Sequence, residues 1–111
     1  MMEITTRDYQ HSNVIRVTGR VDASTYAELE TRLTEYIDKG RRHLILEMDG
    51  TEYLSSAGAR VLITAQKKLK PMGGRVAIAQ PSMRVLDVLK LAGLDTLFPT
   101  YDTTVAALAS E

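Results

Sequence analysis

The chain has 111 residues, a length that suits one domain, and its 14 basic and 14 acidic residues leave no net charge to attract nucleic acid. It contains no cysteine, which excludes disulfides, thiolate metal sites and thiol catalysis. No apolar segment approaches the roughly 20 residues that span a bilayer, and the N-terminus lacks the pattern of a signal peptide, so we expect one cytoplasmic domain over residues 1–111 with no membrane partner.

The first third of the chain predicts a β-hairpin followed by a helix. Alternating apolar and polar residues favour strands over 2–8 and 14–19, which a short polar turn joins. Thr25 and Glu28 have the spacing of a capping box, so a helix is expected to start at Thr25. Gly40 is in the position of a glycine that ends a helix.

The rest of the chain alternates strands with helices. In order, we expect a strand at 43–48, a helix at 56–70, a strand at 75–79, a helix from Ser82 to Gly93, a short edge strand at 98–101 and a helix at 103–109 capped by Asp102. This alternation implies parallel β-α-β units, while the hairpin adds an antiparallel pair. The sequence therefore predicts an α/β domain with a mixed sheet of about four to five strands and about four helices.

Two serines stand where a strand leads into a helix. The apolar run 44–48 stops at Asp49-Gly50, a short connection follows, and Ser55 and Ser56 then precede an amphipathic helical pattern. A helix N-terminus offers unpaired backbone N–H groups and a partial positive charge, so it accommodates a phosphate. The serines have two possible roles: one is a helix cap, because serine is a preferred N-cap residue, and the other is a phosphorylation site.

A second strand-to-helix loop, at 19–25, contains Asp22. Taken alone, Asp22 is a carboxylate at a helix terminus. Because the carboxyl ends of parallel strands meet at one edge of a sheet, this loop is expected beside Ser55 and Ser56. The two loops would then form one face of the domain.

Other kinds of site find little support in the sequence. His11 and His43 are the only histidines and have no ligand cluster around them, so no metal and no cofactor are predicted. The G-x-S-x-G motif of serine hydrolases is absent, and Gly73-Gly74 leads into a strand rather than a helix, which is the wrong context for a nucleotide loop. We therefore expect a protein that is not an enzyme.

The chain resembles the STAS domain family, and within it the single-domain bacterial anti-sigma factor antagonists. The segments that carry this resemblance, besides the closing helix, are VTGRVDAST (17–25), LILEMDGTEYLSSAGARVLI (44–63) and KPMGGRVAIAQPSMRVLDVLKLAGLDTLFPTYDT (70–103). They cover nearly the whole chain in the family's order. The resemblance implies a single STAS-like domain.

The resemblance also implies a function and its residues. In that family, a serine kinase that is itself the anti-sigma factor binds the unphosphorylated antagonist and phosphorylates it on a serine. The phosphorylated form is released, and a PP2C-type phosphatase resets it. By position, the phosphoacceptor corresponds to Ser56, and the partner-binding surface to Asp22, Ser55, Ser56 and Gly58.

The sequence departs from the family pattern at two positions. Ser55 stands where aspartate is typical, and Ala57 stands where serine or threonine is common. Ser55 is therefore the alternative acceptor. Two alternative functions stay open: a constitutive STAS scaffold subunit in a lipid-transport or stress-sensing complex, and a small nucleotide-handling enzyme with Asp22 or Glu52 as base.

Overall fold

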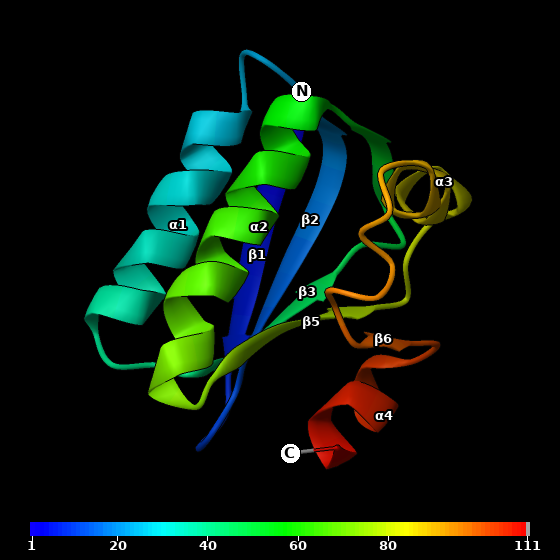
Figure 1. Cartoon of the computed structure of the whole chain (residues 1–111). Coiled ribbons are helices and arrows are strands. Elements are labelled where there is room, and N and C mark those ends of the chain that lie inside the picture. The colour runs from blue at the N-terminus through cyan, green and yellow to red at the C-terminus, as the bar shows by residue number, and fades with distance from the viewer. Residues whose placement is uncertain (111) are drawn as a thin grey trace.

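The computed structural model describes residues 1–110, which form one mixed sheet with helices on both faces (Figure 1). Its strands are β1 (Met2–Asp8), β2 (Asn13–Val21), β3 (His43–Glu47), β4 (Thr51–Leu54), β5 (Arg75–Ala79) and β6 (Thr100–Tyr101). Its helices are α1 (Tyr26–Asp38), α2 (Ser56–Leu69), the short 3-10 helix η1 (Lys70–Met72), α3 (Met83–Leu91) and α4 (Thr104–Ala109). These elements confirm the predicted α/β architecture, with one strand more than expected.

The two N-terminal strands form the predicted antiparallel hairpin. Met2 pairs with Gly19 and Asp8 with Asn13, so β1 is an edge strand along most of β2. Gly19 has φ +90°, and a Cβ added there would lie 2.1 Å from the carbonyl oxygen of Met1. Only glycine fits this close approach of the chain start to β2.

β2 pairs with two strands in succession along its other edge. Its first half, from Asn13 to Arg16, is parallel to β3, and after a register shift at Gly19/Arg20 its last residues are parallel to β4. The sequence analysis took 51–54 for a connection, and this was wrong. The segment has four residues and follows the Asp49-Gly50 break, so its strand conformation depends on pairing with β2 rather than on a local pattern.

The sheet separates two apolar layers of unequal size. The larger layer lies between the sheet and the helices α1, α2 and α3, and the smaller one lies under α4 on the opposite face. The buried leucine, isoleucine and valine residues that the helices contribute to the larger layer are Leu29, Leu33, Ile37, Val61, Leu62, Leu69, Val85 and Leu89. Burial of each such side chain stabilises the fold by roughly 1.5–3 kcal/mol.

Several helix ends agree with the predictions. Gly40 and Gly93 have φ values of +87° and +69° just past α1 and α3. The backbone N–H of Leu94 donates to the carbonyl of Leu89 over 2.7 Å, which is the bond of a Schellman motif. The side chain of Ser82 caps α3 by accepting from the N–H of Val85.

One predicted cap bond and one predicted cap residue were wrong. Thr25 is the N-cap residue of α1, as expected, but its side chain makes no cap bond. The Thr25 hydroxyl does not bind the Glu28 N–H, because it donates to the carbonyl of Arg20 over 2.8 Å and accepts from the N–H of Asp22. The β2–α1 loop thus uses the group that a capping box would need. Helix α4 is capped by Thr103 rather than Asp102, with the Thr103 hydroxyl accepting from the N–H of Ala106.

A buried carboxylate joins elements on the α4 side of the sheet. Glu47, on β3, is 5% exposed, and it accepts hydrogen bonds from Arg7 over 3.1 Å, from Arg16 over 3.0 Å and from the hydroxyl of Thr104. Burial alone raises the pKa of Glu47, but the hydrogen bonds from Arg7, Thr104 and Arg16 outweigh it and lower the pKa to about 2. The charged form of Glu47 therefore links β1, β2, β3 and α4.

This link predicts a pH-dependent loss of stability on replacing Glu47. Because folding lowers the pKa from 4.5 to about 2, its stabilisation is complete above pH 4.5 and is lost as the pH falls toward 2. Glu47→Gln should lower the free energy of unfolding by about 3 kcal/mol at pH 7 and by much less near pH 3, as measured by urea denaturation.

The exposed Glu52→Gln variant is the matched control and should stay within about 0.5 kcal/mol of the wild type at both pH values. A Glu47→Gln deficit of the same size at pH 7 and pH 3 would contradict the role of the charged carboxylate.

Candidate functional site

Ser55 is the N-cap of α2. Its backbone is extended, with φ −80° and ψ 169°, and its Oγ accepts the N–H of Gly58 over 3.1 Å. The side chain thereby satisfies one of the orphan donors of the first helical turn. Aspartate makes the same kind of cap, so serine at position 55 can replace the capping function of the family's usual aspartate.

Ser56 is the first residue of α2, and its side chain is exposed. The N–H groups of the first helical turn lie directly behind it, together with the positive end of the helix dipole. No hydrogen bond of the Ser56 hydroxyl occurs within residues 1–110. The two serines therefore differ: Ser55 is half-buried and engaged in the cap, whereas Ser56 is accessible.

The loop after β2 lies directly beside this helix start, as the sequence analysis predicted. The backbone N–H of Ser55 donates to the carbonyl of Val21 over 2.9 Å. Gly58 packs against the same residue, and a Cβ added to Gly58 would lie 2.6 Å from Cγ1 of Val21 and 2.8 Å from Cδ1 of Leu54. The small residue at 58 thus permits close packing between α2 and the ends of β2 and β4.

Asp22 follows Val21 and interacts within its own loop. Its Oδ1 accepts from the backbone N–H of Ser24 over 3.0 Å and from the Ser24 hydroxyl over 2.7 Å. These bonds and the neighbouring Arg20 hold the pKa of Asp22 below its usual value. Among the described residues, Asp22 bonds to neither Ser55 nor Ser56, so it shares their face as a separate negative charge.

An apolar groove of about 540 Å³ runs between α2 and α3 and starts at Ser56. Its walls are mostly apolar, and of residues 1–110 Arg60 alone lines it with a charged side chain. The other lining residues are Ala59, Ile63, Val88, Leu91, Ala92 and Leu94. The groove therefore joins the accessible serine to an apolar surface.

The exposed apolar residues of α3 were not singled out as a surface in the sequence analysis. Leu91 is 90% exposed and Met83 is 74% exposed, although both are apolar residues of the predicted helix from Ser82 to Gly93. The buried residues of α3 are Val85 and Leu89, and positions two residues away point to another side of a helix. This helical phase was the available signal that Leu91 and Met83 lie off the core face.

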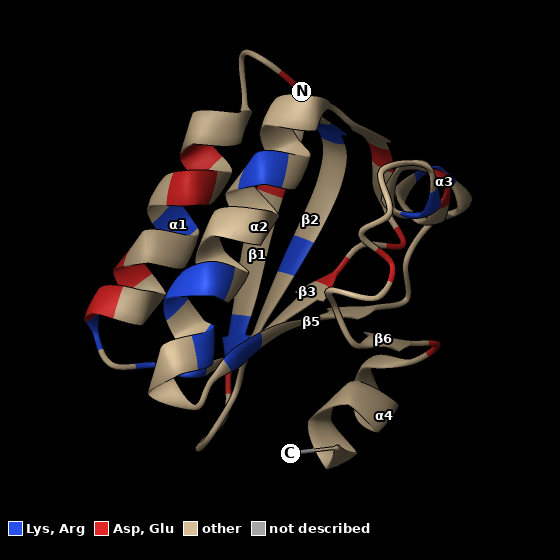
Figure 2. Cartoon of the chain, viewed as in Figure 1, with Lys and Arg blue, Asp and Glu red and all other residues tan. Residues whose placement is uncertain are grey.

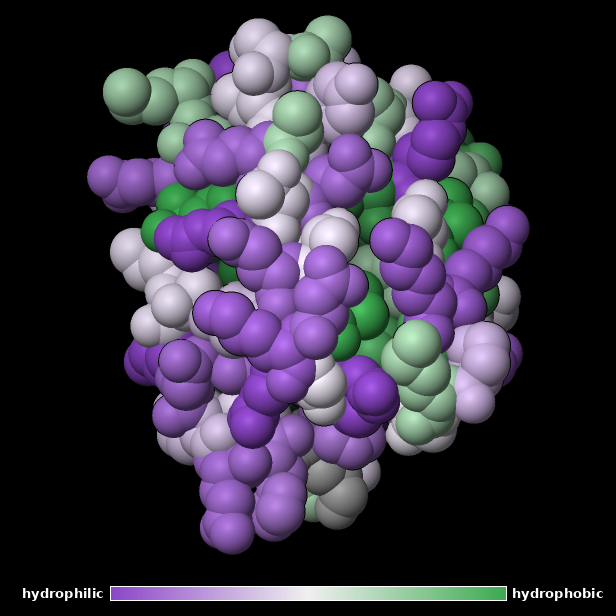
Figure 3. Space-filling model, turned by 90° about the vertical axis from the view of Figure 1, so that its left-hand side faces the viewer, coloured by the Kyte–Doolittle hydropathy of each residue, from purple (hydrophilic) through white to green (hydrophobic). Residues whose placement is uncertain are grey.

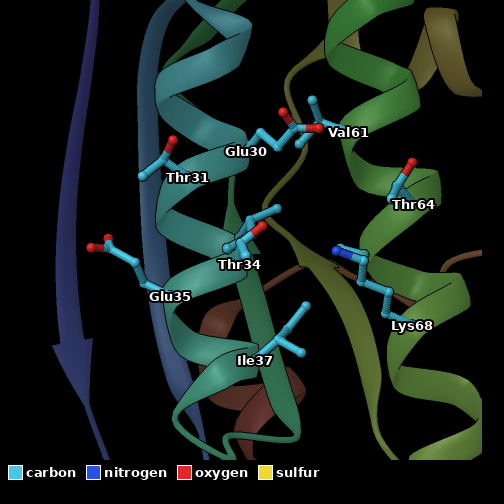
Figure 4. A pocket seen from close by; sticks show the side chains of 10 residues that line it. Glu30, Thr31, Thr34, Glu35, Ile37, Val61, Thr64 and Lys68 are labelled. Atoms are coloured by element: carbon cyan, nitrogen blue, oxygen red, sulfur yellow. The ribbon is translucent and has the colours of Figure 1, made fainter.

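The hollow between α1 and α2 differs from the apolar groove because charged side chains line it. Between α1 and α2, Glu30 and Glu35 come from one wall and Lys68 from the other (Figure 4). The α1 side of the molecule is largely hydrophilic (Figure 3). The surface beside Ser56 is thus distinguished by its apolar character.

The two histidines lie in other parts of the fold than Ser55 and Ser56. His43 begins β3, and His11 lies in the β1–β2 turn, whereas Ser55 and Ser56 follow the carboxyl end of β4. Within residues 1–110, no three or more His, Cys, Asp or Glu side chains are grouped to hold a metal ion. Over the same residues, no helix is long and apolar enough to cross a membrane.

Comparison with known proteins gives consistent matches. The sequence model of the STAS domain matches residues 3–107. BtrV of Bordetella bronchiseptica is 30% identical over 92 residues, which are 83% of this chain and 79% of BtrV. The anti-sigma F factor antagonist of Paenibacillus polymyxa is 26% identical over 96 residues, which are 86% of this chain and 82% of the relative.

Solved structures show the same fold. An anti-sigma factor antagonist from Mycobacterium paratuberculosis superposes with a TM-score of 0.90 at 24% identity, covering 99% of this chain and 93% of its own. The antagonist SpoIIAA matches in its unphosphorylated form with a TM-score of 0.84 at 19% identity, covering 96% and 93%. Its phosphorylated form matches with a TM-score of 0.78 at 18% identity, covering 97% and 98%.

Because only Ser55 makes the cap bond, substitution of Ser55 is predicted to change the stability of the domain more than substitution of Ser56. Ser55→Ala removes the acceptor of the Gly58 N–H and should lower the free energy of unfolding by about 1 kcal/mol. Ser55→Asp should keep most of that stability, because aspartate also caps helices. Ser56→Ala is the matched control and should stay within about 0.5 kcal/mol of the wild type.

Urea denaturation of the four proteins measures these differences. Equal losses for Ser55→Ala and Ser56→Ala would contradict the division between capping and accessible serine.

Proposed function

Because this chain belongs to the STAS domain family, we propose that it is an anti-sigma factor antagonist switched by phosphorylation of Ser56. In the unphosphorylated state it binds an anti-sigma factor that is also a serine kinase. Phosphorylation ends this binding, and a PP2C-type phosphatase restores it. The observation that carries the proposal is the exposed Ser56 at the start of α2, beside an apolar groove.

The choice of Ser56 over Ser55 follows from access and hydrogen bonding. A kinase needs the hydroxyl oxygen free, and the Ser55 oxygen accepts the cap bond while its side chain is half-buried. A phosphate on Ser56 would stand at the helix N-terminus, where negative charge is stabilised. Modification of Ser56 therefore leaves the fold intact, in line with the two phosphorylation states of SpoIIAA sharing one fold.

The groove between α2 and α3 is the proposed contact for the apolar part of the partner. Ser56 lies at its end, and exposed Leu91 supplies a large apolar side chain that the core does not use. Arg60 is one helical turn after Ser56 and forms no ion pair within residues 1–110, so it is free to bind a partner carboxylate. Asp22 and Ser55 complete this face, and the buried Gly58 supports it through close packing on Val21 and Leu54.

Phosphorylation changes this surface in two ways. It adds about two negative charges beside the apolar groove, and it places a phosphate four residues before Arg60, the spacing of an i,i+4 pair. A phosphate bound to Arg60 withdraws that cation from the partner and must be desolvated if the partner still binds. A loss of a few kcal/mol at the interface corresponds to about 100-fold weaker binding.

The proposed role places the protein in the cytoplasm, where sigma factors act. It involves no catalysis. Among the described residues that line the groove, Arg60 is the one with a charged side chain, and both histidines belong to elements away from it. Neither histidine therefore stands beside Ser56 as a general base. Purified protein incubated with ATP or GTP should release no phosphate.

Phosphosite mapping tests the acceptor. The wild type, Ser56→Ala and Ser55→Ala are incubated with ATP in an extract of the organism of origin, and phosphopeptides are identified by mass spectrometry. Phosphate should appear on Ser56 in the wild type and in Ser55→Ala, and should disappear in Ser56→Ala. Undiminished incorporation in Ser56→Ala would exclude Ser56 as the acceptor.

Binding measurements test the switch itself. The anti-sigma factor kinase recovered with the wild type is purified and its affinity is measured by calorimetry for the wild type, Ser56→Ala and Ser56→Asp. Ser56→Asp should bind at least about tenfold more weakly, while Ser56→Ala should bind like the wild type. Equal binding by all three, unchanged after phosphatase treatment, would favour a constitutive STAS scaffold instead.

The proposed use of the groove predicts that Leu91, which lies outside the serine loop, contacts the partner kinase. Leu91→Asp places a charge on the apolar groove wall and should weaken kinase binding at least about tenfold without unfolding the domain, since Leu91 is 90% exposed. Val105→Asp is the matched control, because Val105 is 75% exposed on α4 and lies on the opposite side of the sheet. Equal effects of the two substitutions would remove the groove from the interface.

A further inference from the structure

Three arginines at the end of the sheet opposite Ser56 form no salt bridge with any of residues 1–110. Arg41 and Arg42 lie in the loop between α1 and β3, and Arg75 begins β5 beside them. None of the three forms an ion pair within residues 1–110, although the arginines elsewhere on the sheet, such as Arg7 and Arg16, bind carboxylates. Figure 2 shows basic residues gathered at this lower end, near acidic residues at the ends of α1 and β1. We call the part of the surface with Arg41, Arg42 and Arg75 the basic end.

A hollow of about 570 Å³ lies at this basic end. It is lined by Gln10, His11, Gly40, Arg41, Arg42 and His43, with Leu108 of α4 as an apolar wall. No carboxylate of residues 1–110 lines it. The hollow between α1 and α2 has both acidic and basic side chains, whereas the described residues that line the hollow at the basic end include two arginines and two histidines.

Arg41 is held in place before any ligand binds. Its Nε donates to Oδ1 of Asn13 over 2.5 Å, and an Nη donates to the carbonyl of Tyr9 over 2.7 Å. Asn13 is buried and is itself fixed by a bond to Asp8 over 2.7 Å. The guanidinium position is therefore determined by the protein, which lowers the ordering cost of binding.

Arg42 and His43 have unused hydrogen-bonding capacity. Arg42 donates one side-chain bond, to the carbonyl of Arg41 over 3.2 Å, and the remaining N–H groups of its guanidinium have no partner in the described chain. The Nδ1 atom of His43 is buried without a hydrogen-bond partner. The free N–H groups of the Arg42 guanidinium are therefore available to an anionic ligand.

We propose that this hollow, which we call the basic hollow, binds a small anion with a phosphate group. A doubly charged, tetrahedral oxyanion matches the fork of an arginine guanidinium, and the Arg42 N–H groups that have no partner in the described chain supply donors. The hollow, of about 570 Å³, has room for a phosphate with a small organic substituent. The site is separate from the Ser56 switch and does not depend on the function proposed for it.

Chemical-shift titration of the full chain tests the proposal. Inorganic phosphate and glycerol 3-phosphate are added in parallel to ¹⁵N-labelled protein, with sodium chloride of equal ionic strength as the reference. The amides of residues 40–43 and His11 should shift saturably with at least one phosphate compound and not with chloride. A stronger response to glycerol 3-phosphate assigns the site to a phosphate monoester, and a stronger response to inorganic phosphate assigns it to the free ion.

Two charge-matched variants complete the test. Arg42→Gln should bind at least about tenfold more weakly, because it removes a charge-assisted donor. Lys67→Gln removes one positive charge from the exposed side of α2, outside the basic hollow, and should bind like the wild type. Shifts that stay linear with concentration, that chloride reproduces, or that both variants reduce equally would overturn the proposal.

Discussion

The pairing of β2 with two strands along one edge is the constraint on which the candidate site depends. β3 pairs with the first half of β2, the chain turns at Asp49-Gly50, and β4 then continues beside the second half. This second pairing ends with Val21 opposite Leu54, so the loops that follow both strands start side by side. The bond from Ser55 to Val21 and the close packing of Gly58 on Val21 extend the pairing into α2.

Stability and the proposed switch use different residues of this fold. Glu47 links three strands to α4, and the side chain of Gln66 joins α2 to the backbone of Val76 and Leu97 with bonds of 2.6–3.1 Å. Ser55 serves the helix start. Ser56 contributes little to any of these interactions, because it points to solvent. A serine that the fold does not need is free to carry a charge that changes only the surface.

The two ends of the parallel strands differ in chemistry as well as in position. At the carboxyl ends, Ser56 opens onto apolar walls with a single arginine. At the amino ends, arginines without acidic partners surround the basic hollow. Equal numbers of acidic and basic residues make the chain neutral overall, yet the folded protein distributes them unevenly, pairing Arg7 and Arg16 with carboxylates and leaving Arg42 without a salt bridge among residues 1–110. Net charge therefore limits non-specific attraction to nucleic acid without describing local binding surfaces.

The sequence by itself determined the order of the elements, the mixed α/β class and the serines at a strand-to-helix junction, because periodicity and capping are signals between residues near in the chain. Only the tertiary structure decided that 51–54 is a strand, that Thr25 binds its own loop, and that Leu91 faces solvent. It also separated Ser55 from Ser56, whose neighbouring positions look equivalent in sequence. Each of these outcomes depends on partners or surroundings distant in the chain, such as β2 for 51–54, and local patterns carry no information about such contacts.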